Sequence, residues 1–156
     1  TLDISAETEP KYQWENADNT NNPDDYGRLY THYAVLDQRG VCPSGWHVPT
    51  MADWNVLFSN TGGTINAGGR LKENGTIHWD SPNYISVNVI PFAALPNGLR
   101  YDTGSFAWLG SEAYYWSSTG NVTNYAYSIL FQNDGMNINQ YSLSENTGAT
   151  IRCLKD

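Results

Sequence analysis

The chain is poor in cysteine, in basic side chains and in charge of either sign. Its 156 residues include 2 cysteines and 8 lysine and arginine residues, and only 15% of the residues are charged. The 16 acidic residues give a net charge of -8 at pH 7, which repels phosphate backbones and anionic lipid headgroups over a Debye length of about 8 Å. We therefore expect no nucleic-acid partner and no binding to an anionic membrane surface.

Long apolar runs are also lacking. No segment approaches the roughly 20 apolar residues that cross a bilayer, and the N-terminus has no basic region followed by an apolar one. We expect no membrane insertion of this domain. We expect any export signal or lipid anchor to lie upstream of the segment given.

The length and the 40% hydrophobic content suit one compact domain. Residues 1–11 are polar and unpatterned, so we expect them to form a leader or linker. Residues 12–156 are expected to form the single domain.

The two cysteines, Cys42 and Cys153, are far apart in the sequence. They fit neither a zinc-ligand spacing nor a CxxC redox motif, which leaves a long-range disulfide or two buried thiols. We expect the disulfide. A disulfide implies an oxidising compartment, so the domain is expected to be secreted or displayed at the cell surface.

One helix is indicated after Pro49. Thr50 and Asp53 form a T-x-x-D pattern typical of a capping box. The apolar residues that follow recur at helical spacing on one face: Met51, Trp54, Leu57 and Phe58. Gly62 and Gly63 should end this helix, and residues 67–73 should add a short helical turn.

Beyond the helix, residues 75–110 are rich in turn formers and aromatics and predict a long, ordered, irregular loop. Three later segments predict strands of an antiparallel meander, at residues 113–118, 125–131 and 149–154. The pattern predicts an α+β fold with one main helix, a long irregular loop region and a small antiparallel sheet that includes the C-terminal strand.

Several long motifs follow one another in a characteristic order: YGRLYTHYAV, CPSGWHVPTMADWNVL, GGRLKENGTIHW, FAALPNGLR, GSFAWLGSEAYYWSST and TIRCLKD. From about residue 12 to the end, they resemble the Fibrobacter succinogenes major paralogous domain, a module of exported bacterial proteins. The C-terminal domain of the Legionella collagen-like adhesin has similar W-x-[LV]-P-T, Y-W-S-S and R-C elements. Through that group, the resemblance implies a C-type-lectin-like domain.

Calcium-dependent lectins of this kind supply carboxylate and amide oxygens from Glu-Pro-Asn and Trp-Asn-Asp motifs, because Ca²⁺ takes roughly six or more oxygen ligands. The corresponding segments here lack the carboxylates: Leu95-Pro96-Asn97, Ser81-Pro82-Asn83 and Trp116-Ser117-Ser118. We expect no metal site and no cofactor.

Catalytic patterns are weak. His32, His47 and His78 lie in unrelated contexts, and no nucleophile elbow is present. Asp80, Asp102 and Glu112 could supply the pair of carboxyl groups, about 5 to 10 Å apart, that glycosidases use. With 16 acidic residues such coincidences are common, so we expect no catalytic residues and no enzyme.

Residues 119–146 are crowded with Asn, Tyr, Ser and Gln, the adaptable mixture that antibody paratopes use. Our candidate ligand-binding residues are Trp108, Tyr114, Tyr125, Asn133, Asp134, Asn137, Asn139 and Tyr141. The alternative is that Tyr127, Ile129 and Phe131 form a buried strand face and the asparagines only make turns. We expect Trp46, Trp54 and Trp116 in the core.

The sequence thus favours a non-catalytic, exported ligand-binding or adhesion module of a bacterial surface protein. Its partner would be a neutral or cationic glycan or a protein. One alternative is a structural spacer domain of a surface lipoprotein or pilus-like assembly. The other is a carboxylate-dependent glycan-processing enzyme.

Overall fold

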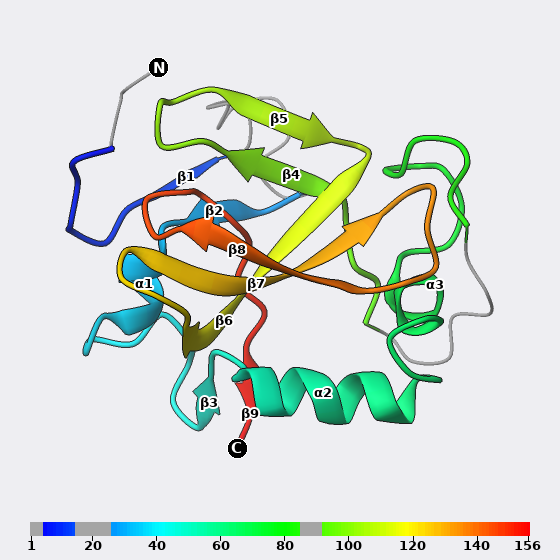
Figure 1. Cartoon of the computed structure of the whole chain (residues 1–156), viewed down its shortest axis with the longest axis horizontal. Coiled ribbons are helices and arrows are strands. Elements are labelled where there is room, and N and C mark those ends of the chain that lie inside the picture. The colour runs from blue at the N-terminus through cyan, green and yellow to red at the C-terminus, as the bar shows by residue number, and fades with distance from the viewer. Residues whose placement is uncertain (1–4, 15–25, 85–91) are drawn as a thin grey trace.

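The computed structural model describes residues 5–14, 26–84 and 92–156 (Figure 1). Strands make up most of its regular structure, and helices are few. The elements follow in the order β1 (Tyr12–Trp14), β2 (Arg28–Tyr30), α1 (His32–Leu36), β3 (Trp46–His47), α2 (Met51–Asn60), α3 (Ala67–Leu71), β4 (Asn97–Arg100), β5 (Phe106–Leu109), β6 (Glu112–Gly120), β7 (Tyr125–Gln132), β8 (Asn139–Ser144) and β9 (Leu154–Lys155).

The central sheet has five strands in the order β5-β4-β6-β7-β8. Its neighbours pair antiparallel except β4 and β6, which pair parallel. Two short antiparallel ribbons complete the described fold, β1 with β2 and β3 with β9. The long β6–β7 hairpin forms the middle of the molecule (Figure 1).

Each face of the central sheet contributes to a buried cluster, because successive side chains of a strand point to opposite faces. One face packs Tyr115, Ile129 and Phe131 against Trp54 and Phe58 of α2. The other face buries a second cluster of Leu99, Tyr114, Trp116, Ala126, Leu130, Leu143 and Ala149. Figure 1 shows α2 running along the edge of the molecule beside β9.

For β7 the structure favours the alternative of a buried strand face, because Ile129 and Phe131 are fully buried, while Tyr127 is half-buried. Trp54 and Trp116 are core residues as expected, but Trp46 is 42% exposed. The expectation for Trp46 is wrong because this residue lies on β3, whose only described strand partner is the two-residue β9.

The main helix begins as the sequence predicts. The side chain of Thr50 accepts a hydrogen bond from the Asp53 backbone N–H, and the Asp53 carboxylate accepts from the Thr50 N–H at 2.9 Å. The helix ends at Asn60, before Gly62 and Gly63 with φ of +93° and +75°. These glycines adopt a conformation that other residues rarely take.

The disulfide between Cys42 and Cys153 is present and spans 111 residues of sequence, with Cα atoms 5.8 Å apart. It fastens the segment before β3 to the segment before β9. None of the described helices has the length and apolar character needed to span a bilayer.

Three expectations about the strands need correction. The region expected to be an irregular loop contains β4 and β5, although residues 85–91 lie outside the described part. Asn97 and Gly98, a pair typical of turns, instead begin the buried strand β4. Gly98 adopts φ of +63° where β5 approaches closely. Residues 139–144, treated as part of a turn-rich binding segment, form β8.

The third correction concerns the C-terminus. The terminal strand was expected in the main sheet, but β9 pairs with β3, placing Leu154 opposite His47. The preceding residues meet β6 through an isolated bridge between Thr150 and Tyr115. The disulfide at Cys153 holds the chain end beside Cys42, away from the sheet.

The expected leader also contacts the domain. The Lys11 N–H donates to the Thr31 hydroxyl at 3.1 Å, and the Asn146 amide donates to the carbonyl of Ser5 at 2.6 Å. Residues 1–4 lie outside the described part of the chain.

A buried histidine lies in surroundings that disfavour its protonated form. His32 is fully buried, with Nε2 3.1 Å from the carbonyl oxygen of Ser117 and Nδ1 3.4 Å from a carboxylate oxygen of Glu145. Burial is the largest influence and lowers its pKa below 6.5, while Ser117 and Glu145 act in the opposite direction. The unfolded chain therefore binds a proton at this residue more readily than the folded one.

We expect the free energy of unfolding to fall as the pH falls below 6.5, because protonation of His32 favours the unfolded chain. Urea unfolding at pH 7 and pH 5 measures this change. The variant His32→Gln should show a shallower loss between the two pH values. A variant with the same loss as the parent would show that other groups produce the acid sensitivity.

Candidate functional site

A row of hydrogen-bonded side chains crosses β6, β7 and β8 on the face opposite α2. Glu112 accepts from the Tyr114 hydroxyl at 2.5 Å and from Nε2 of Gln132 at 3.0 Å. Asn139 Nδ2 donates to the Gln132 side-chain oxygen at 3.2 Å, and Asn137 Nδ2 donates to the Asn139 oxygen at 3.0 Å. Each polar group therefore fixes the orientation of the next.

Strand register explains this row. Glu112 lies directly opposite Gln132 across the β6–β7 pair, and Leu130 lies opposite Asn139 across the β7–β8 pair. Residues two apart on one strand share a face. Glu112 and Tyr114 therefore share one face of β6, and Gln132 shares the face of Leu130 on β7.

Exposed aromatic rings flank the row. Tyr141 is 49% exposed and contacts Tyr114 edge-on, with ring centroids 6.0 Å apart. Trp108 is 49% exposed and donates from its indole N–H to the Tyr101 hydroxyl at 3.3 Å. We call this surface the tyrosine–amide face, defined by Tyr101, Trp108, Glu112, Tyr114, Gln132, Asn137, Asn139 and Tyr141.

Tyr114 connects the row of hydrogen-bonded side chains to the exposed rings of the tyrosine–amide face. Burial, followed by the neighbouring Glu112 carboxylate, raises the pKa of Tyr114, with smaller contributions from Tyr141 and Tyr101. Its hydroxyl therefore stays protonated at neutral pH and donates to Glu112. The face presents oriented amides and exposed rings around one carboxylate.

The structure brings five of the eight predicted residues together on this face: Trp108, Tyr114, Asn137, Asn139 and Tyr141. Tyr114 is only 5% exposed, so it supports Tyr141 and does not itself offer a free ring for stacking. Tyr125 lies apart, at the other end of β7. It lines a hollow of about 370 Å³ together with Tyr33 and Asn124.

The remaining two, Asn133 and Asp134, lie in the turn that follows β7. The buried ammonium of Lys72 donates to the carbonyl oxygens of Gln132, Asn133 and Gly135, at 2.7, 3.3 and 2.9 Å. Burial lowers the pKa of Lys72 to about 8, and Asp134 acts in the opposite direction. This turn is therefore anchored from beneath by a cation.

Sequence reasoning missed Tyr101 and Gln132, and it considered Glu112 only as a possible catalytic acid. Strand alternation was the available signal for Glu112, because it places this residue on the same face as Tyr114. The position of Gln132 opposite Glu112 follows from the β6–β7 register, which no local sequence pattern specifies.

The other acids considered for catalysis are Asp80 and Asp102. The Asp102 carboxylate accepts from the N–H of Thr103 at 2.8 Å, and the exposed Asp80 adjoins Gly110. The described residues contain no group of three or more His, Cys, Asp or Glu side chains placed to hold a metal ion.

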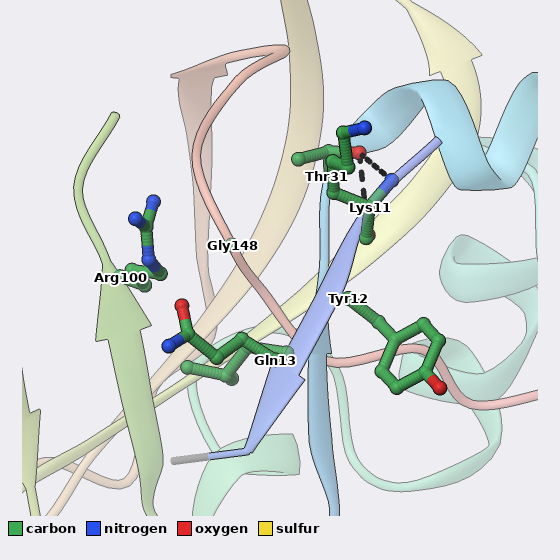
Figure 2. Close-up of a pocket in the computed structure, with 7 residues that line it drawn as sticks. Lys11, Tyr12, Gln13, Thr31, Arg100 and Gly148 are labelled. Carbon is green, nitrogen blue, oxygen red and sulfur yellow. Dashed lines mark hydrogen bonds between the residues drawn. The ribbon is translucent and has the colours of Figure 1, made fainter. Parts of the chain in front are cut away.

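A separate hollow of about 300 Å³ lies between the β1–β2 ribbon and β4 (Figure 2). Figure 2 shows Gln13 extending from β1 towards Arg100 on β4, while the ring of Tyr12 leaves β1 on the other side. The Lys11 ammonium pairs with Glu7 at 3.2 Å, and Arg100 donates to the Tyr101 carbonyl at 3.1 Å. The charged groups around this hollow thus already hold neighbouring chain segments.

A family model described as the Fibrobacter succinogenes major domain matches residues 2–155. No curated protein and no solved structure gives a significant match to the chain.

Proposed function

The chain belongs to the Fibrobacter succinogenes major domain family, and we propose that it is a ligand-binding module of an exported bacterial protein that recognises a glycan. The tyrosine–amide face is the proposed binding surface. The Cys42–Cys153 disulfide supports an oxidising, extracytoplasmic location.

The observation that carries this proposal is the row of linked amides between exposed aromatic rings. Amide groups both donate and accept hydrogen bonds, as sugar hydroxyls do. The rings of Tyr141 and Trp108 offer apolar faces for stacking on the C–H surface of a sugar. Because neighbours already orient Gln132 and Asn139, less conformational freedom is lost on binding.

We also propose that the fold is C-type-lectin-like. Three features support this assignment: the long helix α2, the twisted central sheet, and the disulfide that returns the C-terminal segment to the region before α2. In such a domain, the tyrosine–amide face would serve as the binding surface without calcium.

A glycan array probed with the purified chain tests the proposed function. The best glycan is then measured by titration calorimetry against Tyr141→Ala and Trp108→Ala. We expect each substitution to weaken binding about tenfold, because loss of one stacked ring removes an interaction of roughly 1–2 kcal/mol.

The matched control is Val56→Ala. Val56 is a 62% exposed hydrophobic residue on α2, which covers the opposite face of the sheet. The Val56→Ala variant should bind the glycan with the same affinity as the parent. An array without any bound glycan would favour the spacer function, and equal losses for Val56→Ala and Tyr141→Ala would exclude the tyrosine–amide face as the binding surface.

A further inference from the structure

The tyrosine–amide face carries a carboxylate whose charge no neighbour cancels. Glu112 is half-buried on β6, and its two carboxylate oxygens accept from the Tyr114 hydroxyl at 2.5 Å and from Nε2 of Gln132 at 3.0 Å. Both donors are neutral groups, so they orient the carboxylate and leave its negative charge in place. Each carboxylate oxygen has two lone pairs, so each can accept a second hydrogen bond.

The basic side chains of the protein lie elsewhere. No Lys, Arg or His of the described residues is within salt-bridge distance of Glu112. The ammonium of Lys72, beneath the turn after β7, donates to backbone carbonyls of that turn. Burial lowers the pKa of Lys72 to about 8, and the carboxylate that opposes this shift is Asp134. Within the described part of the chain, Glu112 therefore lacks a cationic partner.

Exposed aromatic side chains lie near this carboxylate. Tyr141 is 49% exposed and Tyr101 is 40% exposed. After burial and Glu112, these two residues also raise the pKa of Tyr114, so both lie near the hydroxyl that donates to Glu112. The ring of Tyr141 contacts that of Tyr114 edge-on. Because ring faces attract cations, grouped aromatic side chains are a recurring site for ammonium ligands.

Trp108 is presented by a strained backbone. Its φ of +68° lies in the left-handed region, which bulky side chains rarely adopt. Such strained residues cluster at ligand sites, because the ligand contact compensates for the strain. The indole N–H donates to the Tyr101 hydroxyl, which orients both exposed rings. Trp108 and Tyr101 are therefore placed to stack on the body of a sugar.

We propose that the tyrosine–amide face selects glycans that carry a protonated amino group, as glucosamine does, with this group beside the Glu112 carboxylate and the ring of Tyr141. This inference rests on the proposed function and narrows its ligand class. An ammonium group supplies both the positive charge that Glu112 lacks and donors for its oxygens. Gln132 and Asn139 each retain a second amide N–H for a sugar hydroxyl.

Two other classes of glycan fit this arrangement less well. A sugar acid is repelled by Glu112 and by the net charge of -8. An N-acetylated amino sugar has the same ring and hydroxyl groups as glucosamine but no positive charge. The difference between an amino sugar and its acetylated form therefore isolates the role of the Glu112 carboxylate.

Titration calorimetry of the full chain at pH 5.5 compares the tetramer of glucosamine, the tetramer of N-acetylglucosamine and the tetramer of galacturonic acid. We expect the glucosamine tetramer to bind about tenfold tighter than the acetylated one. The galacturonic acid tetramer should not bind. A lysine tetrapeptide, which carries amino groups without sugar rings, should bind more weakly than the glucosamine tetramer.

Glu112→Gln removes the charge and keeps a side chain of the same shape. The Tyr114 hydroxyl can accept as well as donate, so the new amide can keep this partner. Binding of the glucosamine tetramer should weaken about tenfold, while binding of the acetylated tetramer stays the same. The matched control is Glu9→Gln, which removes the same charge from an exposed residue and should keep the tenfold preference. Melting temperatures show whether both variants are folded.

Salt provides a test that needs no variant. Raising the NaCl concentration from about 0.1 M to about 1 M shortens the Debye length from about 10 Å to about 3 Å. Binding of the glucosamine tetramer should weaken several-fold, and binding of the acetylated tetramer should change less than about twofold.

Four results would overturn the inference: equal or tighter binding of the acetylated tetramer, equal responses of the two tetramers to salt, equal losses in Glu112→Gln and Glu9→Gln, or a lysine tetrapeptide that binds as tightly as the glucosamine tetramer. The first three leave the proposed glycan binding in place, because a neutral glycan can still bind the face. A glycan array without any bound glycan is the separate result that counts against the proposed function itself.

Discussion

Removal of the Cys42–Cys153 bond should lower the free energy of unfolding by about 4 kcal/mol. The bond closes a loop whose ends are 111 residues apart, and cross-linking a loop of roughly 100 residues restricts the unfolded chain by about 4.7 kcal/mol. Urea unfolding of the double variant Cys42→Ser/Cys153→Ser, compared with the oxidised parent, measures the loss. Adding a reductant should lower the stability of the parent and leave that of the variant unchanged.

A loss below about 1 kcal/mol would contradict this prediction. It would mean that the unfolded chain is already restricted without the bond, or that the native bond is strained enough to cancel the entropic gain.

Lys72→Met should lower the free energy of unfolding by about 3 kcal/mol. The side chain of Lys72 is fully buried, and its ammonium donates to three carbonyl oxygens of the turn after β7. Hydrogen bonds to a charged group contribute about 1.5–3 kcal/mol each, and the substitution leaves these carbonyls without their donor. Urea unfolding at pH 7 measures the loss.

The control for this experiment is Lys155→Met, which removes the same charge from an exposed position on β9. Its effect should stay within about 0.5 kcal/mol. Equal stabilities of the two variants would show that water takes over the role of the Lys72 ammonium.

The parts of the fold that depend on neighbouring residues could be predicted from the sequence. The start of α2 depends on Thr50 and Asp53, three residues apart, and its buried face repeats at helical spacing. These signals lie within a single helix, so no long-range contact is needed to interpret them.

The missed strands depend on distant partners. Only Leu143 is buried among the six residues of β8, so its pattern lacks the alternation that identifies a strand. In β4, a Cβ atom on Gly98 would lie 2.3 Å from the Ala107 carbonyl oxygen of β5. Glycine here permits close strand approach, whereas the local sequence Pro96-Asn97-Gly98 indicates a turn.

The sequence predicted the residue types of the candidate site, but only some of the residues that form it. The Asn- and Tyr-rich segment does supply Asn137, Asn139 and Tyr141 to the tyrosine–amide face. Asn133 and Asp134 are equally polar, but their turn is tied to Lys72, which lies far away in the sequence.

The single covalent cross-link also determines which residues carry mechanical tension. A pull on the two ends of this chain passes along the residues up to Cys42, across the sulfur–sulfur bond and out through the last residues after Cys153. This path of tension does not pass through the intervening segment, residues 43–152. The whole tyrosine–amide face lies in this bypassed segment, so a bound ligand would be held on a part of the molecule that the pull does not stretch directly.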